Sequence, residues 1–150
     1  MYDIEELYQE IIIDHSRNPR NFGKLDTANK TAEGYNPLCG DQITLYIELK
    51  DKLINKIKFS GSGCAISKAS ASLMTETINQ KTESEAIIIF NNFRQMITKT
   101  TDEDYDSDIL GDLEILKGVS AFPSRIKCAT LAWHALKSIL DNNNQQISTE

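Results

Sequence analysis

The chain carries three cysteines, and each lies where a sulfur atom could do chemistry rather than fill a core. Cys39 lies in the turn "NPLCGDQ", Cys64 opens a predicted helix behind the turn "GSG", and Cys128 lies near the start of the last predicted helix. A helix N-terminus presents unpaired N–H groups and a partial positive charge, which stabilise a thiolate and lower its pKa. Cys64 and Cys128 are therefore candidates for ionised thiols, and we expect the glycines before Cys64 to let the backbone turn closely around its sulfur.

Thiolates that lie together require a cation, and zinc accepts sulfur, imidazole and carboxylate ligands in a tetrahedron. Asp41 follows Cys39 by two positions and projects to the same side if this stretch is extended. With the three cysteines it would complete four ligands, whose negative charge Arg125 would help to balance. However, the sequence has no Cys-x-x-Cys pair, and 63 residues separate Cys64 from Cys128. Spacing alone leaves two interpretations open: a shared metal site, or three unrelated thiols buried as small hydrophobic side chains.

The strands that would position these residues follow from alternating apolar residues. Residues 43–49 alternate apolar and polar positions and predict a half-buried strand. Residues 53–59 predict a second strand, joined to the first through a turn at 50–52 in a hairpin, with Leu53, Ile57 and Phe59 on one face. A weaker strand at 31–35 is expected to pair with this hairpin.

Helices are predicted wherever apolar residues recur at helical spacing. They are expected at residues 3–15, 64–78, 83–97, 110–116 and 124–140. Gly118 is expected to end the fourth helix, the acidic stretch 98–108 to form a solvated loop, and the polar tail from about residue 141 to be frayed. The result is an α+β fold in a single domain spanning 1–150, with a small antiparallel sheet of about three strands and helices packed on one face.

Composition excludes several classes of function. Sixteen basic against 22 acidic residues give a net charge of −6 and an isoelectric point near 5.0, which argues against a nucleic-acid partner. Nothing approaches the run of about 18 apolar residues that a membrane helix needs. The first residues are acidic where a signal peptide would be basic, so we expect a cytoplasmic protein with no membrane association.

Four segments carry a resemblance to a known family: "DHSRNPRNFG", "NPLCGD", "GSGCAISKASAS" and "FPSRIKCATLAWHAL". They resemble, in the same order, the SufU branch of the NifU/IscU-like iron–sulfur cluster assembly proteins. The likeness runs from Tyr8 to about Leu140. It implies a SufE/NifU-like fold and a role in iron–sulfur cluster assembly.

The resemblance also implies roles for individual residues. Cys39, Asp41, Cys64 and Cys128 match the metal-binding residues of the family, which hold zinc in the SufU branch. Cys39 matches the cysteine that accepts persulfide sulfur from a SufS-type cysteine desulfurase and passes it towards downstream iron–sulfur assembly proteins. Arg125 matches an arginine typical of this branch, so we expect it near the metal as a supporting residue.

Two departures from the scaffold branch of the family indicate the subtype. Scaffold proteins carry a histidine immediately before the third cysteine, whereas this chain has Lys127, and a lysine ammonium cannot ligate a metal at neutral pH. The segment between Cys64 and Cys128 is also longer than in scaffolds. Both features favour a zinc-dependent sulfurtransferase. The alternatives are a scaffold that holds iron or a transient [2Fe–2S] cluster on the same cysteines, and a structural zinc domain used for protein binding.

Some polar residues attract attention but are assigned ordinary roles. His15 ends the first predicted helix, where an imidazole caps or packs, and His134 is expected at the surface or rim of the last helix. Ser67, Ser70 and Ser72 are interpreted as close-packing residues, since no base is suggested for a serine nucleophile.

Overall fold

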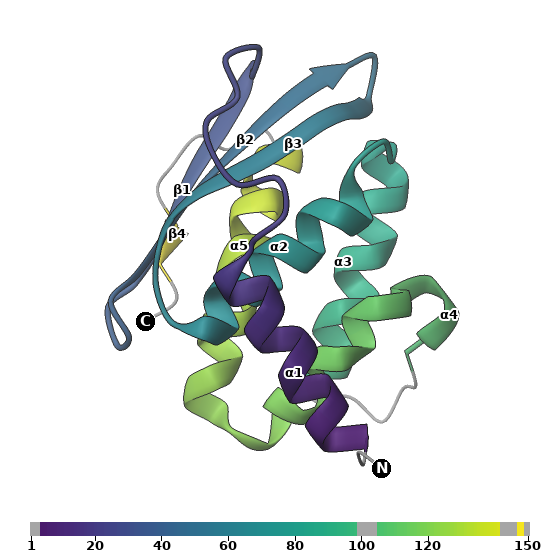
Figure 1. The fold of residues 1–150 in the computed structure, drawn as a ribbon. Helices are drawn as coiled ribbons and strands as arrows, with labels where there is room; N and C mark the ends of the chain where they lie inside the picture. The colour runs from purple at the N-terminus through teal and green to yellow at the C-terminus, as the bar shows by residue number, and fades with distance from the viewer. Residues whose placement is uncertain (1–3, 99–104, 142–146, 149–150) are drawn as a thin grey trace.

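The computed structural model describes residues 4–98, 105–141 and 147–148, and its strands form one sheet (Figure 1). The sheet order is β3-β2-β1-β4. Strands β1 (Lys30–Asn36), β2 (Asp41–Lys50) and β3 (Leu53–Ser62) pair antiparallel, which confirms the predicted three-stranded sheet. Strand β4 (Ile147–Ser148) adds a short parallel pairing with β1. The prediction of a frayed tail is therefore wrong at these two residues.

The β2–β3 hairpin explains an error in the predicted face of β3. Asp51 and Lys52 form its two-residue turn, both with positive φ, as a type I′ turn requires. The strand register then shifts between Glu48 and Leu49. Such a bulge reverses which side chains face inward beyond it, so Ile54 is fully buried and Leu53 is only half-buried.

The helices lie on one side of the sheet, as predicted (Figure 1). They are α1 (Ile4–Arg17), α2 (Ala65–Ile78), α3 (Glu83–Thr98), α4 (Ser107–Leu110), the 3₁₀ helix η1 (Gly111–Ala121) and α5 (Pro123–Leu140). Helix α5 packs against β1 and β2, and α2 packs against β3.

Two predictions fail between α3 and α5. Helix α4 begins at Ser107, inside the segment predicted as a solvated loop, and residues 99–104 of that segment lie outside the described residues. Helix η1 continues through Gly118, which was expected to end a helix. Tight 3₁₀ turns accommodate a glycine without requiring an unusual φ, and Gly118 is not among the glycines with positive φ.

The core is organised around α5. Trp133 is fully buried, stacks on Phe93 with ring centroids 4.4 Å apart, and donates its Nε1–H to Ser70 Oγ. Burial extends almost around α5, beyond the single stripe that the sequence predicted, because both the sheet and α2 pack on it. In the described part of the chain, no helix is both long and apolar enough to span a membrane.

Candidate metal centre

Four elements bring the predicted site residues to one end of the sheet. Cys39 lies in the turn between β1 and β2, and Asp41 is the first residue of β2. The end of β3 pairs with the start of β2, so Cys64, two residues beyond β3, lies at the same end. Cys128 approaches from the second turn of α5, which packs on β1 and β2. The long separations in sequence are thus closed by the sheet register and by one helix.

Distances show which of these residues meet. Cys39 Sγ and Cys128 Sγ lie 3.2 Å apart. One ligand atom from each of Cys39, Asp41 and Cys128 falls within 4.8 Å of the others, a spacing that suits a metal ion. Cys64 lies beside this group, with its Sγ 4.0 Å from Asp41 Oδ2. The fold therefore gathers three sulfur atoms and one carboxylate that are dispersed in the sequence.

The carboxylate of Asp41 is fixed from two sides. Asp41 is fully buried, and its Oδ1 accepts a hydrogen bond of 2.8 Å from the backbone N–H of Cys64. Its Oδ2 accepts a hydrogen bond of 3.2 Å from Asn36 Nδ2. Sequence reasoning did not single out Asn36, although it begins the quoted segment "NPLCGD".

The glycines before Cys64 are required by close approach to β2. A Cβ at Gly63 would lie 2.5 Å from Asp41 Oδ1, and a Cβ at Gly61 would lie 2.0 Å from the carbonyl oxygen of Gln42. Gly61 also has a φ of +135°, which side-chain-bearing residues rarely adopt. Gly61 and Ser62 end β3, so "GSG" is not the separate turn that the sequence predicted. Its two glycines nevertheless let the backbone N–H of Cys64 reach the Asp41 carboxylate.

The two helix-associated thiols differ in environment. Cys64 is the N-cap of α2, and its sulfur accepts a hydrogen bond of 3.4 Å from the backbone N–H of Ser67. Cys128 lies beyond the first turn of α5 and is only 1% exposed. Burial, followed by its contacts with Cys39 and Cys64, raises the pKa of the Cys128 thiol. The predicted helix-lowered pKa is therefore wrong for Cys128, since desolvation outweighs a dipole that is concentrated in the first turn.

Arg125 lies beside the three thiols. Its side chain is exposed, and its pKa is raised first by a hydrogen bond with Cys128 and then by the charges of Cys64, Cys128 and Cys39. The guanidinium therefore provides positive charge next to the cluster.

The donor set fits a thiophilic metal ion. A buried carboxylate beside three thiols is unfavourable unless a cation compensates the charge, and a bound cation also favours deprotonated sulfur. Three sulfurs and one carboxylate oxygen are ligands that zinc accepts in a tetrahedron, and iron also binds thiolates. The residues present thus fit either metal, with zinc matching the number and type of ligands.

The two histidines lie outside this cluster. His15 is buried, with its Nδ1 2.8 Å from Ser72 Oγ, and burial is the main cause that lowers its pKa. This confirms the packing role. His134 is half-buried with its ring against Phe90, so it is more enclosed than a surface residue. Ser70 and Ser72 are buried where α2 packs against α5 and α1, in agreement with the close-packing interpretation.

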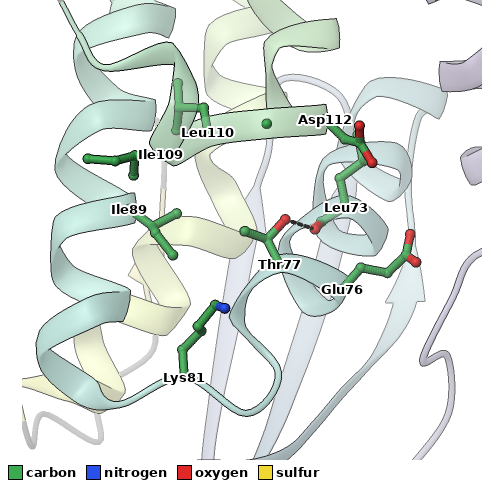
Figure 2. A pocket seen from close by; sticks show the side chains of 9 residues that line it. Leu73, Glu76, Thr77, Lys81, Ile89, Ile109, Leu110 and Asp112 are labelled. Carbon is green, nitrogen blue, oxygen red and sulfur yellow. Dashed lines mark hydrogen bonds between the residues drawn. The ribbon is translucent and has the colours of Figure 1, made fainter.

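A hollow elsewhere on the molecule was not predicted. It has a volume of about 390 Å³ and lies between α2, α3 and the start of η1 (Figure 2). Glu76, Asp112 and Lys81 place charged groups around apolar side chains such as Leu73 and Ile89. None of the four candidate ligands lines it, so it is separate from the candidate metal centre.

The chain is similar to known proteins over most of its length. The family of NifU-like N-terminal domains matches residues 7–129. The zinc-dependent sulfurtransferase SufU of Bacillus subtilis is 44% identical over 136 residues, covering 90% of this chain and 90% of the relative. The iron–sulfur cluster assembly scaffold protein IscU of Streptococcus pyogenes is 39% identical over 137 residues, covering 91% and 84%.

A solved structure agrees in fold. It belongs to a protein of Fervidobacterium islandicum proposed as an iron–sulfur cluster assembly scaffold for the SUF system. It superposes with a TM-score of 0.84 at 37% identity, over 91% of this chain and 98% of that one.

Proposed function

Because the chain belongs to the family of NifU-like N-terminal domains, we propose that it is a zinc-dependent sulfurtransferase of iron–sulfur cluster assembly. Its zinc ligands are Cys39, Asp41, Cys64 and Cys128. Cys39 accepts persulfide sulfur from a SufS-type cysteine desulfurase in the cytoplasm and passes it to downstream assembly proteins. The Bacillus subtilis relative, which is named a zinc-dependent sulfurtransferase, supports this proposal.

One structural observation carries the choice of Cys39 as the acceptor. Asp41 is held by two hydrogen bonds, Cys128 is buried, and Cys64 caps a helix. Cys39 is half-buried in a turn, and within the described residues its sulfur makes a hydrogen-bond contact only with Cys128. Of the four candidate ligands, Cys39 is therefore the one that can leave the cluster with the least rearrangement.

The chemistry of acceptance follows from the thiols. Zinc, when bound, would keep the cysteine ligands deprotonated at neutral pH. The Cys39 thiolate attacks the outer sulfur of the desulfurase persulfide. A new S–S bond forms on Cys39, the old S–S bond breaks, and its electron pair stays on the desulfurase cysteine. Arg125, exposed beside the thiols, stabilises the negative charge of the Cys39 persulfide that results.

A second candidate function is a scaffold for a transient [2Fe–2S] cluster on the same cysteines. The Streptococcus pyogenes relative, named a scaffold protein, favours it. Lys127 argues against it, because an ammonium cannot replace a histidine ligand.

Metal and sulfide analysis tests the two candidates. Protein purified without oxygen and without added metal is expected to contain about one zinc per chain and no labile sulfide. Incubation with desulfurase and cysteine should then add one sulfur atom to Cys39, detected by mass spectrometry after alkylation. Stoichiometric iron with sulfide would establish the scaffold instead, and normal sulfur acceptance by Cys39→Ser would overturn the assignment of Cys39.

A further inference from the structure

We propose that Asn36 is a positioning residue of the metal centre, whose side-chain amide holds Asp41 and Cys128 in place while Cys39 exchanges. The inference rests on the proposed function only in that it takes these residues to bind a metal.

The position of Asn36 brings its side chain between two elements. It is the last residue of β1, pairs directly with Asp41 at the start of β2, and is fully buried. Its Nδ2 lies 3.2 Å from Asp41 Oδ2 and 3.5 Å from Cys128 Sγ on α5. An amide NH₂ carries two protons, so one can be directed at each candidate ligand.

The carbonyl oxygen of the Asn36 side chain shows what orients the amide group. Asn36 Oδ1 is buried and has no hydrogen-bond partner among the described residues. Nothing on that side therefore fixes the amide. The opposite orientation would face the carbonyl oxygen towards a carboxylate oxygen and a sulfur, which are both acceptors. The two ligand atoms thus determine how Asn36 sits, and Asn36 in turn limits how they move.

The contacts of Asn36 also separate the candidate ligands into two groups. Asn36 touches Asp41 and Cys128, whereas among the described residues it makes no hydrogen bond to Cys39 or to Cys64, which is instead fixed by capping α2. Hydrogen bonds from neighbouring residues orient metal ligands and raise metal affinity. Asn36 therefore stabilises the part of the site that must persist when Cys39 leaves to accept sulfur.

Zinc affinity, measured by competition with a chromophoric chelator, tests this role without any activity assay. Asn36→Leu has similar volume but no donors, and we expect its zinc dissociation constant to rise by about 10- to 100-fold. The cobalt-substituted variant should also show altered visible absorption, because the ligands are displaced. Thr130→Val is the matched control: it removes a different buried donor, this one on α5, that bonds only to backbone carbonyls of its own helix, and should change zinc affinity by less than about twofold.

A second variant distinguishes positioning from packing. Aspartate resembles asparagine in shape more closely than leucine does. If Asn36 only fills space in the core, Asn36→Asp should therefore reduce zinc affinity less than Asn36→Leu. If the donors matter, it is the more harmful one, because a carboxylate would face Asp41 and Cys128. The proposal is overturned if Asn36→Asp binds zinc more tightly than Asn36→Leu, if both lose less than tenfold, or if neither folds by circular dichroism. If only one of the two variants folds, a loss of tenfold or more in that variant supports the proposal and a smaller loss overturns it.

The same measurements separate this inference from the proposed function. In one outcome the parent protein binds zinc and accepts no sulfur, while both Asn36 variants bind zinc more weakly. That result would contradict the sulfurtransferase proposal and leave the role of Asn36 standing. Parent protein that accepts sulfur while the Asn36 variants keep full zinc affinity would do the reverse.

Discussion

The sulfur atoms of Cys39 and Cys128 lie 3.2 Å apart although 89 positions separate the two residues in sequence. Their environments are unequal, because Cys39 is half-buried in a turn and Cys128 is only 1% exposed. The accessible thiol thus has a sheltered thiol within reach. Under the proposed function, a sulfur atom carried by Cys39 would therefore start next to the Cys128 sulfur.

This contact predicts a specific disulfide when metal is removed. Oxidation with diamide in the presence of a chelator should join Cys39 to Cys128, since the two sulfurs need to approach only slightly further to bond. Peptide mapping without reduction should detect the bond as a loss of two hydrogen atoms. Cys64→Ser should retain it and Cys39→Ser should abolish it. Zinc-loaded protein should resist oxidation, and equally rapid oxidation with zinc bound would contradict metal ligation by these thiols.

A methyl group at Gly63 is expected to damage the centre. In Gly63→Ala the new Cβ would lie 2.5 Å from Asp41 Oδ1 and 3.1 Å from Asp41 Cβ, so the carboxylate must move. We expect zinc affinity to fall by at least about tenfold and the free energy of unfolding to fall by about 1–3 kcal/mol, as for other overpacked positions. Chelator competition and urea denaturation measure the two effects.

Gly118→Ala is the matched control for that substitution. Apart from its own helix backbone and its chain neighbours, no described residue has an atom within 4 Å of a Cβ added at Gly118, and its φ is not positive. The alanine should leave zinc affinity unchanged and raise stability by about 0.4–1 kcal/mol, because it restricts the unfolded chain. A comparable loss of zinc in both variants would show that the effect at Gly63 is not a clash with Asp41.

The sequence predicted the strands and long helices because alternating or helical spacing of apolar residues governs local structure. It did not predict that the side chain of Ile54 faces the core, because the bulge opposite Glu48 and Leu49 depends on how β2 and β3 pair. It could propose Cys39, Asp41, Cys64 and Cys128 as candidate ligands only from their chemical types and a family resemblance. Their proximity depends on sheet register and the docking of α5, which no local pattern encodes.

The same limit applies to Asn36 and to the pKa of Cys128. An asparagine before a turn is ordinary in sequence, and only the structure reveals that its amide faces Asp41 and Cys128. The helix dipole near Cys128 could be foreseen from the sequence, whereas the burial of the Cys128 side chain could not.

Two buried serines on α2, Ser67 and Ser70, should respond differently to substitution by alanine. Ser70 Oγ accepts the Nε1–H of Trp133 and donates to the carbonyl of Ala129. Ser70→Ala leaves both groups buried without this partner, so we expect a loss of about 1–3 kcal/mol in the free energy of unfolding. The fluorescence of Trp133, the only tryptophan in the chain, reports the unfolding transition in urea.

Ser67→Ala supplies the contrast. Ser67 is equally buried, but its Oγ has no hydrogen-bond partner among the described residues. Removing this hydroxyl relieves an unpaired polar atom and improves helix propensity, so stability should be unchanged or higher by up to about 1 kcal/mol. Equal destabilisation of both variants would contradict the distinction between the two hydroxyls.

Acidification should destabilise the fold through its two histidines. Burial, followed by the charge of Arg20, lowers the pKa of His15, and burial with the charge of Arg94 lowers that of His134. Below the ordinary histidine pKa of 6.5, the unfolded chain binds protons that the folded protein does not bind. The free energy of unfolding should therefore be constant above about pH 7.5 and fall progressively as the pH drops towards about 5.5.

Substitution assigns this pH dependence to the imidazoles. His15→Asn places an amide where Nδ1 meets Ser72 Oγ but cannot gain a proton in this range, so its stability should vary less with pH than that of the parent. The double variant with His134→Asn should be nearly independent of pH in the same window. Carboxylates with lowered pKa, such as Asp14 and Glu48, are already ionised there in both states and do not contribute. Urea denaturation with chelator present at every pH removes the contribution of metal binding, and an unchanged slope in the double variant would locate the titrating groups elsewhere.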